Sequence, residues 1–164
     1  MPTRASVEPD FDLMLLLCQA SHALTTELTA GLAELGITPR AHCVLTHALT
    51  GDLTQSELAD LCGLDKTTMV VTMDELEQAG LAQRLLSSAD RRARIISVTA
   101  AGRRKVGQAN AIVSRIYADV LAALPASERQ GFVNGLSRLV GGRLSVPIEC
   151  ERPVRRPRAR QVVR

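Results

Sequence analysis

The sequence predicts a mainly α-helical fold with one small β-hairpin. Ala and Leu dominate the apolar residues, and aromatic residues make up only 2% of the chain, which favours helices packed through aliphatic side chains. Apolar residues recur at intervals of three and four along most of the chain, as in amphipathic helices. The spacing changes to that of strands only within residues 81–98. A length of 164 residues suits a single domain, which we place at residues 10–145.

The first predicted helix spans residues 11–35. Gly36 ends it, because glycine readily adopts the left-handed conformation that closes many helices. A second helix begins at Thr38 and Pro39, since a Thr side chain can cap free backbone amides and Pro suits the first helical position. It ends near residues 50–51. The apolar stripe of the first helix consists of Leu13, Leu17, Ala20, Leu24, Leu28, Leu32 and Leu35.

Two short helices joined by a tight turn are predicted next. Thr54 and Glu57 have the spacing of a capping box, in which each side chain satisfies a free backbone amide of the other residue. The helix that they open ends at the turn 62–64, which has a central glycine. Asp65 then caps a further helix that ends at residues 79–80. Two short helices joined in this way form a helix-turn-helix.

The second helix of this pair is the candidate recognition helix. We expect it to bury Val70, Met73 and Leu76. The groups that would then point outward are small or polar and suit a DNA major groove. They are Lys66, Thr67, Thr68, Val71 and Thr72. Because no Arg or Gln on this face offers a two-point contact with a base, we expect specificity to depend partly on DNA shape.

The hairpin is predicted from strands at residues 81–86 and 94–98, separated by a polar segment. It completes a winged helix-turn-helix at about residues 38–98. Its basic tip suits the negative potential of a narrow minor groove, although any single Arg there could equally be a solvated charge. The tip residues are Arg91, Arg92 and Arg94, and the candidate phosphate contacts are Arg84, Ser87 and Ser88.

Two more helices are predicted after the hairpin, within residues 99–141. Thr99 caps the first, which runs to about Leu124, and Ser127 with Gln130 has the spacing of a second capping box, which would open the last helix. The apolar faces are Val106, Ala109, Val113, Ile116, Val120 and Leu124 in the first, and Phe132, Val133, Leu136, Leu139 and Val140 in the last. This is more apolar surface than a small winged unit can cover. We therefore expect residues 11–35 and 99–141 to form a dimer interface.

Charge divides the chain in two. Residues 1–80 carry a net charge of −9 and residues 81–164 a net charge of +12. Because the basic residues are clustered, the second half is expected to meet a polyanion; two merely solvated faces would not explain the clustering. Residues 1–9 are expected to form a flexible arm, and the Arg- and Pro-rich residues 146–164 a disordered tail.

Other function classes find little support in the sequence. The cysteines lie far apart without a C-x-x-C pair, so we expect neither a zinc ribbon nor a disulfide framework, and no metal or other cofactor. They are Cys18, Cys43, Cys62 and Cys150. No nucleophile with a neighbouring base is recognisable, so we do not expect an enzyme. The longest apolar run, residues 13–18, is too short to span a membrane, and we expect a cytoplasmic protein.

Two segments resemble the MarR family of transcriptional regulators. Residues 64–70 and 76–81 with Arg84 resemble the recognition helix of that family and its exit. Residues 90–94 and 98–102 resemble the wing and the start of the next helix. The match covers residues 12–140. It implies a homodimer that binds a palindromic operator in double-stranded DNA and acts as a repressor, and it implies that Arg92 enters the minor groove.

The resemblance also implies release from DNA by a small, often phenolic, ligand or by cysteine oxidation. Candidate ligand-binding residues are Cys18, His22 and His42. Cys18 lies where the organic-peroxide-sensing branch of the family keeps its reactive thiol, so a thiol-based oxidation sensor is one alternative. That branch supports its thiolate with tyrosines, whereas this chain has only Tyr117. The other alternative is a winged-helix module for protein association without DNA binding.

Overall fold

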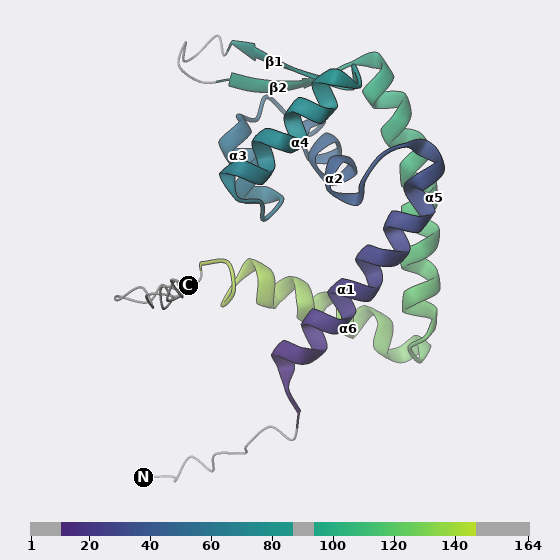
Figure 1. Cartoon of the computed structure of the whole chain (residues 1–164). Helices are drawn as coiled ribbons and strands as arrows, with labels where there is room; N and C mark the ends of the chain where they lie inside the picture. The colour runs from purple at the N-terminus through teal and green to yellow at the C-terminus, as the bar shows by residue number, and fades with distance from the viewer. Residues whose placement is uncertain (1–10, 87–93, 147–164) are drawn as a thin grey trace, which may run out of the picture. The chain divides into compact units, whose positions relative to one another are not determined.

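The computed structural model describes residues 11–86 and 94–146 of the chain. Its elements are mainly helices, with one two-stranded antiparallel sheet (Figure 1). They are α1 (Leu13–Leu32), the 3-10 helix η1 (Ala33–Leu35), α2 (Pro39–Ala48), α3 (Gln55–Leu61), α4 (Lys66–Gln78), β1 (Ala82–Leu86), β2 (Arg94–Val98), α5 (Ala100–Ala122) and α6 (Ala126–Gly141). The predicted fold class is confirmed. The expected N-terminal arm and nearly all of the expected tail lie outside the described residues.

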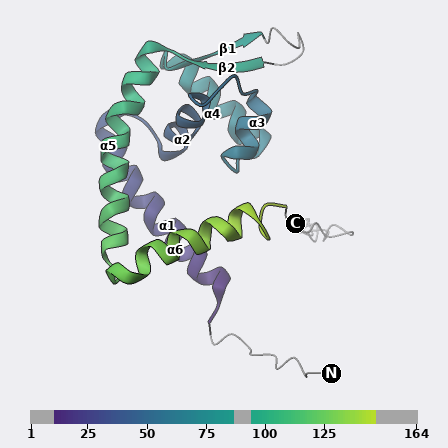
Figure 2. The same ribbon diagram turned by 180° about the vertical axis from the view of Figure 1, so that it is seen from behind.

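The described chain forms two compact units, one ending at Val120 and the other beginning at Leu121. In the first unit, α2 lies between α5 on one side and the α3–α4 pair on the other, as the two opposite views agree (Figures 1 and 2). None of the helices in the described part of the chain has the length and apolar character needed to cross a membrane.

The predicted boundary between the first two helices, at Gly36 and Thr38, is confirmed, whereas α2 ends at Ala48, slightly before the predicted residues 50–51. The carboxylate of Asp12 accepts a hydrogen bond from the amide of Leu15 at 2.9 Å and so begins α1. Gly36, with φ of 62°, ends the 3-10 turn that follows α1. The hydroxyl of Thr38 accepts from the amide of Ala41 at 3.1 Å and begins α2. Each cap satisfies an amide that has no partner within its helix.

The predicted helix-turn-helix is also confirmed. The Thr54 hydroxyl accepts from the Glu57 amide at 3.2 Å, and the Glu57 carboxylate accepts from the Thr54 amide at 2.8 Å, which completes the capping box of α3. The Thr54 hydroxyl also donates to this carboxylate at 2.8 Å, and the two hydrogen bonds that the carboxylate accepts from Thr54 lower the pKa of Glu57. Gly63 turns the chain with φ of 62°, and the Asp65 carboxylate begins α4 by accepting from the Thr68 amide at 2.9 Å.

The core of the first unit lies where the end of α1 meets α2, α3, α4, β2 and α5. Its largest fully buried apolar side chains come from four of these helices, and burying each contributes about 1.5–3 kcal/mol. They are Leu32, Val44, Leu45, Leu58, Met69 and Met73. The core therefore fixes α3 and α4 on a common base formed by α1 and α2.

The hairpin pairs Ala82 with Val98 and Leu86 with Arg94 at its two described ends. The Ile96 amide also donates to the Leu53 carbonyl at 3.0 Å, which ties β2 to the segment before α3 and was not predicted. At the base of the hairpin, the Thr99 hydroxyl donates to the Gly80 carbonyl at 2.7 Å and accepts from the Gly102 amide at 3.0 Å. Thr99 therefore caps α5, as predicted, and joins it to the end of α4.

One predicted cap is wrong. The last helix, α6, begins at Ala126 after Pro125, and no side chain caps it. Ser127 lies inside the helix, and the Gln130 amide nitrogen donates to Asn134 at 2.9 Å instead of reaching back to an N-cap residue. The spacing of Ser127 and Gln130 matches a capping box, but the extended backbone of Pro125 starts the helix two residues earlier.

Candidate functional site

The exposed face of α4 differs from the predicted one by about one residue. Thr72, predicted to point outward, is only 1% exposed, and Val70, predicted to be buried, is 44% exposed. The buried stripe of α4 runs through Met69, Thr72, Met73 and Leu76. Thr72 can lie in the core because its hydroxyl donates to the Thr68 carbonyl at 2.8 Å, which leaves no unpaired polar group. Thr72 is therefore removed from the candidate DNA contacts.

Three of the four remaining predicted contacts of α4 are exposed, as expected. Lys66, Thr67 and Val71 are exposed, and Val70 joins them on the same side of the helix. Thr68 is half-buried, and its hydroxyl donates to the Asp65 carboxylate at 2.6 Å. The exposed edge of α4 is thus defined by one cation, one hydroxyl and two branched apolar side chains, which suit the varied edges of base pairs in a major groove.

Arg84 has a different place from the predicted one. In β1, its guanidinium forms ion pairs with Glu77 and with Asp74, the latter at 2.8 Å, and donates to Gln55 at 2.9 Å. Its backbone amide also donates to the Glu77 carboxylate at 2.7 Å. The side chain is 21% exposed. Most of its donors are engaged within the protein, so Arg84 holds β1 against α3 and α4, and its contact with phosphate stays a prediction.

Of the other predicted hairpin contacts, only Arg94 lies within the described residues. Arg94 is exposed at the start of β2. Ser87, Ser88, Arg91 and Arg92 lie outside the described residues. The two strands nevertheless show where the connecting segment leaves β1 and enters β2, at the end of the hairpin opposite Thr99.

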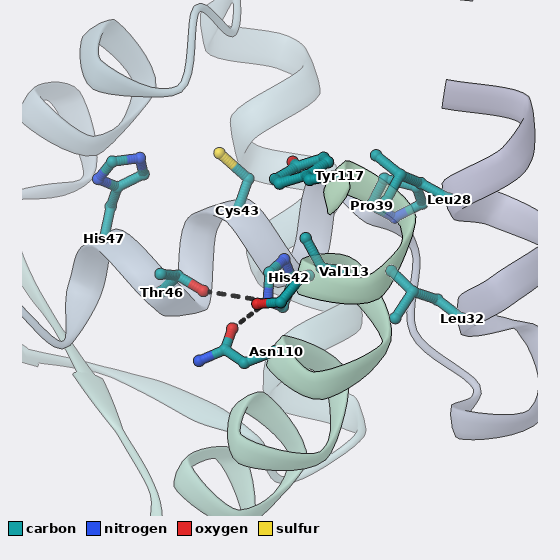
Figure 3. A pocket seen from close by; sticks show the side chains of 11 residues that line it. Leu28, Leu32, Pro39, His42, Cys43, Thr46, His47, Asn110, Val113 and Tyr117 are labelled. Carbon is teal, nitrogen blue, oxygen red and sulfur yellow. Dashed lines mark hydrogen bonds between the residues drawn. The ribbon is translucent and has the colours of Figure 1, made fainter. Parts of the chain in front are cut away.

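A pocket of about 330 Å³ lies between α1, α2 and α5 (Figure 3). Its apolar wall is formed by Leu28, Leu32, Pro39 and Val113, with the Tyr117 ring beside them. Its polar groups come from α2 and α5. They are His42, Cys43, Thr46, His47, Asn110 and Ser114. An apolar cavity of this size with a few polar groups is typical of a small-molecule site.

His42 is the predicted ligand-binding residue that does line this pocket. Its Nε2 lies 2.8 Å from the Asn110 side-chain oxygen and 3.4 Å from the Thr46 hydroxyl. Because an amide oxygen only accepts, the contact with Asn110 places a proton on Nε2. The other two predicted ligand-binding residues, Cys18 and His22, are exposed on α1 and do not line the pocket. The other lining residues were not among the candidates; they include Asn110 and Tyr117, which lie two turns apart on α5.

Cys43, His47 and Cys62 form a cluster that the sequence analysis did not foresee. Their sulfur and imidazole nitrogen atoms all lie within 4.8 Å of one another. A hydrogen bond from the Cys62 thiol, aided by His47, lowers the pKa of Cys43 to about 6 against the opposing effect of burial. The same hydrogen bond, together with burial, raises the pKa of Cys62. The sequence signal that could have indicated part of this cluster is the spacing of Cys43 and His47, which lie one helical turn apart.

Comparison with known proteins agrees with this geometry. A sequence model of the MarR family matches residues 35–93. A MarR family transcriptional regulator from Rhodococcus sp. RHA1 is 27% identical, with a TM-score of 0.72 over 78% of this chain and 91% of that one. CouR from Rhodococcus jostii RHA1, solved with p-coumaroyl-CoA, is 26% identical, with a TM-score of 0.72 over 84% and 96%. CouR has also been solved bound to a 23-mer DNA duplex.

A further match is a MarR family protein of Mycobacterium tuberculosis in complex with p-aminosalicylic acid. It is 29% identical, with a TM-score of 0.66 over 80% of this chain and 100% of that one. The matched residues 35–93 include α2, the helix-turn-helix and β1. The match to the MarR family model over the helix-turn-helix and the agreement of fold over 78–84% of the chain support a winged helix-turn-helix regulator of the MarR family.

Proposed function

We propose that this regulator binds double-stranded DNA as a homodimer, acts as a repressor, and is released by a small aromatic ligand. The observation that carries the proposal is the exposed edge of α4, formed by Lys66, Thr67, Val70 and Val71. Arg84 joins this helix to the hairpin through Glu77 and Asp74, so the edge and the wing would approach DNA as one rigid surface. The DNA-bound relative CouR supports this role for the fold.

The proposed DNA surface combines two kinds of contact. The edge of α4 would enter the major groove, where Lys66 and Thr67 contact phosphate or base edges and the Val70 and Val71 methyl groups meet thymine methyl groups. Arg91, Arg92 and Arg94 would contact the adjacent minor groove, with Arg92 inserted deepest. Ser87 and Ser88 are proposed phosphate contacts.

The homodimer is supported by apolar surface that one copy leaves exposed. Leu13 to Leu17 of α1 are all more than a third exposed, and so are Phe132, Val133, Leu136, Leu139 and Val140 of α6. Exposed apolar faces of this extent usually mark an interface. A dimer with twofold symmetry would present two α4 helices to the two halves of a palindromic operator.

The ligand is proposed to bind in the pocket that His42 lines. The two ligand-bound relatives carry p-coumaroyl-CoA and p-aminosalicylic acid, which both contain a substituted phenol ring. A volume of about 330 Å³ fits one such ring with a short substituent. Leu28, Leu32 and Val113 would contact the ring, while His42 and Asn110 would bind its polar group.

DNA binding is tested by fluorescence anisotropy with the duplex that lies upstream of the chain's own gene. We expect binding that weakens steeply as salt increases, because phosphate contacts release counterions. Lys66→Ala should reduce the salt slope by about one, and Arg92→Ala should weaken affinity about tenfold. Arg104→Ala is the matched control, because it removes one positive charge from an exposed position on α5. Salt-independent binding, or equal effects of all three variants, would contradict the proposal.

Ligand binding is tested by calorimetric titration of the full chain with p-aminosalicylic acid. We expect His42→Ala to weaken binding about tenfold, since the variant removes a hydrogen-bonding group from the pocket. His22→Ala is the matched control, because His22 is exposed on α1 and does not line the pocket. Heats that are unchanged in the His42 variant would place the ligand elsewhere.

A further inference from the structure

The cluster of Cys43, His47 and Cys62 brings three metal-binding side chains together from two helices. Cys43 and His47 lie one turn apart on α2, and Figure 3 shows their side chains on the same side of that helix. Cys62 is the C-cap residue of α3, which packs against α2. Each side chain is half-buried, and each can offer one ligand atom within 4.8 Å of the other two.

We propose that Cys43, His47 and Cys62 bind a thiophilic metal ion, zinc(II) above all, through two thiolates and one imidazole. In a tetrahedral zinc site, with Zn–S bonds of about 2.3 Å, neighbouring ligand atoms lie about 3.8 Å apart. The three atoms are within 4.8 Å of one another, so small side-chain rotations would bring them to that spacing. Soft sulfur ligands with imidazole select zinc or copper(I) over magnesium or calcium.

The surroundings of the cluster leave room for exchange of the ion. Cys43 and His47 also line the pocket beside Tyr117, and Cys43 and Cys62 line a second cavity of about 470 Å³ with Thr29. A site with three protein ligands and access from a cavity keeps a fourth position for water or an added ligand, unlike a closed structural zinc site. Both cysteines would bind as thiolates, so binding would release whatever thiol protons they still carry to solvent.

The rest of the core does not depend on this ion. Val44 and Leu58, neighbours of the cluster along α2 and α3, are fully buried among apolar side chains. The metal would therefore add a link between α2 and the first helix of the helix-turn-helix instead of creating the fold. This inference stands independently of whether an aromatic ligand occupies the pocket.

The test is a titration of the untagged, reduced and metal-free full chain with cobalt(II), followed by displacement with zinc(II). We expect one cobalt ion per chain, with the intense absorption of thiolate-to-cobalt charge transfer. Cys43→Ser and Cys62→Ser should each lose most of that absorption, and His47→Ala should weaken cobalt binding at least tenfold. Cys18→Ser, which alters an exposed thiol outside the cluster, should bind as the unaltered chain does. Uptake that survives in the Cys43 and Cys62 variants would overturn the site.

X-ray absorption of the zinc-loaded, unaltered chain gives a second readout that does not depend on variants that fold. We expect two sulfur ligands at about 2.3 Å and one imidazole nitrogen at about 2.0 Å. A shell of only oxygen and nitrogen would contradict the assignment. A chain that takes up no metal when reduced, yet forms a Cys43–Cys62 disulfide with an added disulfide oxidant, would also overturn it.

Discussion

The helix-turn-helix and the outer helices use their apolar residues in opposite ways. In α3 and α4, Leu58, Met69 and Met73 are at most 1% exposed within one copy of the chain. In α1, the residues from Leu13 to Leu17 are all exposed, and α6 buries none of its residues. Both regions have helical apolar patterns. The comparison indicates that the first region buries its apolar residues within the copy, whereas the second leaves an apolar face exposed, which is the face that the proposed dimer would bury.

The largest effect is expected where the winged unit joins α5. A Cβ at Gly102 would lie 2.1 Å from the Leu81 carbonyl oxygen and 2.7 Å from Cγ1 of Val98. Because the oxygen belongs to the backbone, it cannot move aside without breaking the junction that Thr99 caps. We expect Gly102→Ala to lower the free energy of unfolding by about 3 kcal/mol or more, measured by urea denaturation.

Gly107→Ala is the matched control on the same helix. A Cβ at Gly107 meets nothing within 4 Å, so Ala should stabilise α5 by about 0.5–1 kcal/mol through its higher helix propensity. If both glycine variants changed the free energy of unfolding equally, the close approach at Gly102 would not be the cause.

The next effect tests the proposed dimer interface of the outer helices. Leu16→Glu in α1 or Phe132→Glu in α6 places a charge on an exposed apolar face. Because a symmetric dimer carries the substitution in both copies, loss of about 1.5–3 kcal/mol of apolar burial per side chain should raise the dimer dissociation constant by about 100-fold or more, as measured by sedimentation equilibrium.

Val71→Glu provides the control for that experiment. Val71 is 49% exposed, similar to Leu16 and Phe132, but it lies on α4 in the proposed DNA surface. The variant should leave the dimer intact and weaken DNA binding. If Val71→Glu dissociated the dimer and the outer-helix variants did not, the dimer interface would lie on α4 and not on the outer helices.

A smaller effect separates structural arginine from DNA-binding arginine within the winged unit. Arg84→Ala removes ion pairs to Glu77 and Asp74 and should lower the free energy of unfolding by about 1.5–3 kcal/mol, seen in thermal or urea denaturation. Arg94→Ala, at the exposed start of β2, should leave stability within about 0.5 kcal/mol and weaken DNA binding instead. An unchanged stability of Arg84→Ala would contradict its structural role.

The sequence predicts where helices and strands begin and end better than it predicts which helix face is buried or which distant residues come into contact. Caps at Thr38, Thr54 and Asp65 and the turn at Gly63 are local signals, because the partner groups lie within a few residues. The face of α4 was misassigned because a buried Thr72 is satisfied by its own helix, which a hydrophobicity pattern does not reveal.

The residues of the candidate site show the same difference between local signals and contacts that form only in the folded chain. Arg84 is basic and close to the wing in sequence, yet its partner Gln55 is 29 residues away, and only the folded chain brings them together. The cluster of Cys43, His47 and Cys62 likewise joins α2 to the end of α3 across 15 residues. Tertiary neighbours of this kind are invisible to spacing rules, which detect only pairs on one helix or strand.

The smallest expected effect concerns acid and the cap of α4. Hydrogen bonds from the Thr68 hydroxyl and amide lower the pKa of Asp65 in the folded chain. The carboxylate therefore stabilises the fold above the pKa of about 3.9 that Asp has when unfolded, and this contribution is lost as pH falls through the lower folded value.

Asp65→Asn isolates that contribution, because Asn can still cap the helix without a charge. Urea denaturation at a series of pH values should show the unaltered chain to be more stable than the variant at neutral pH, with the difference disappearing in acid. A difference that persists at the lowest pH would mean that the cap acts through shape alone. In that case the geometry of the Asp65 cap would hold the start of α4 without help from its charge. The buried stripe of α4 is likewise held without charge, by packing in the core.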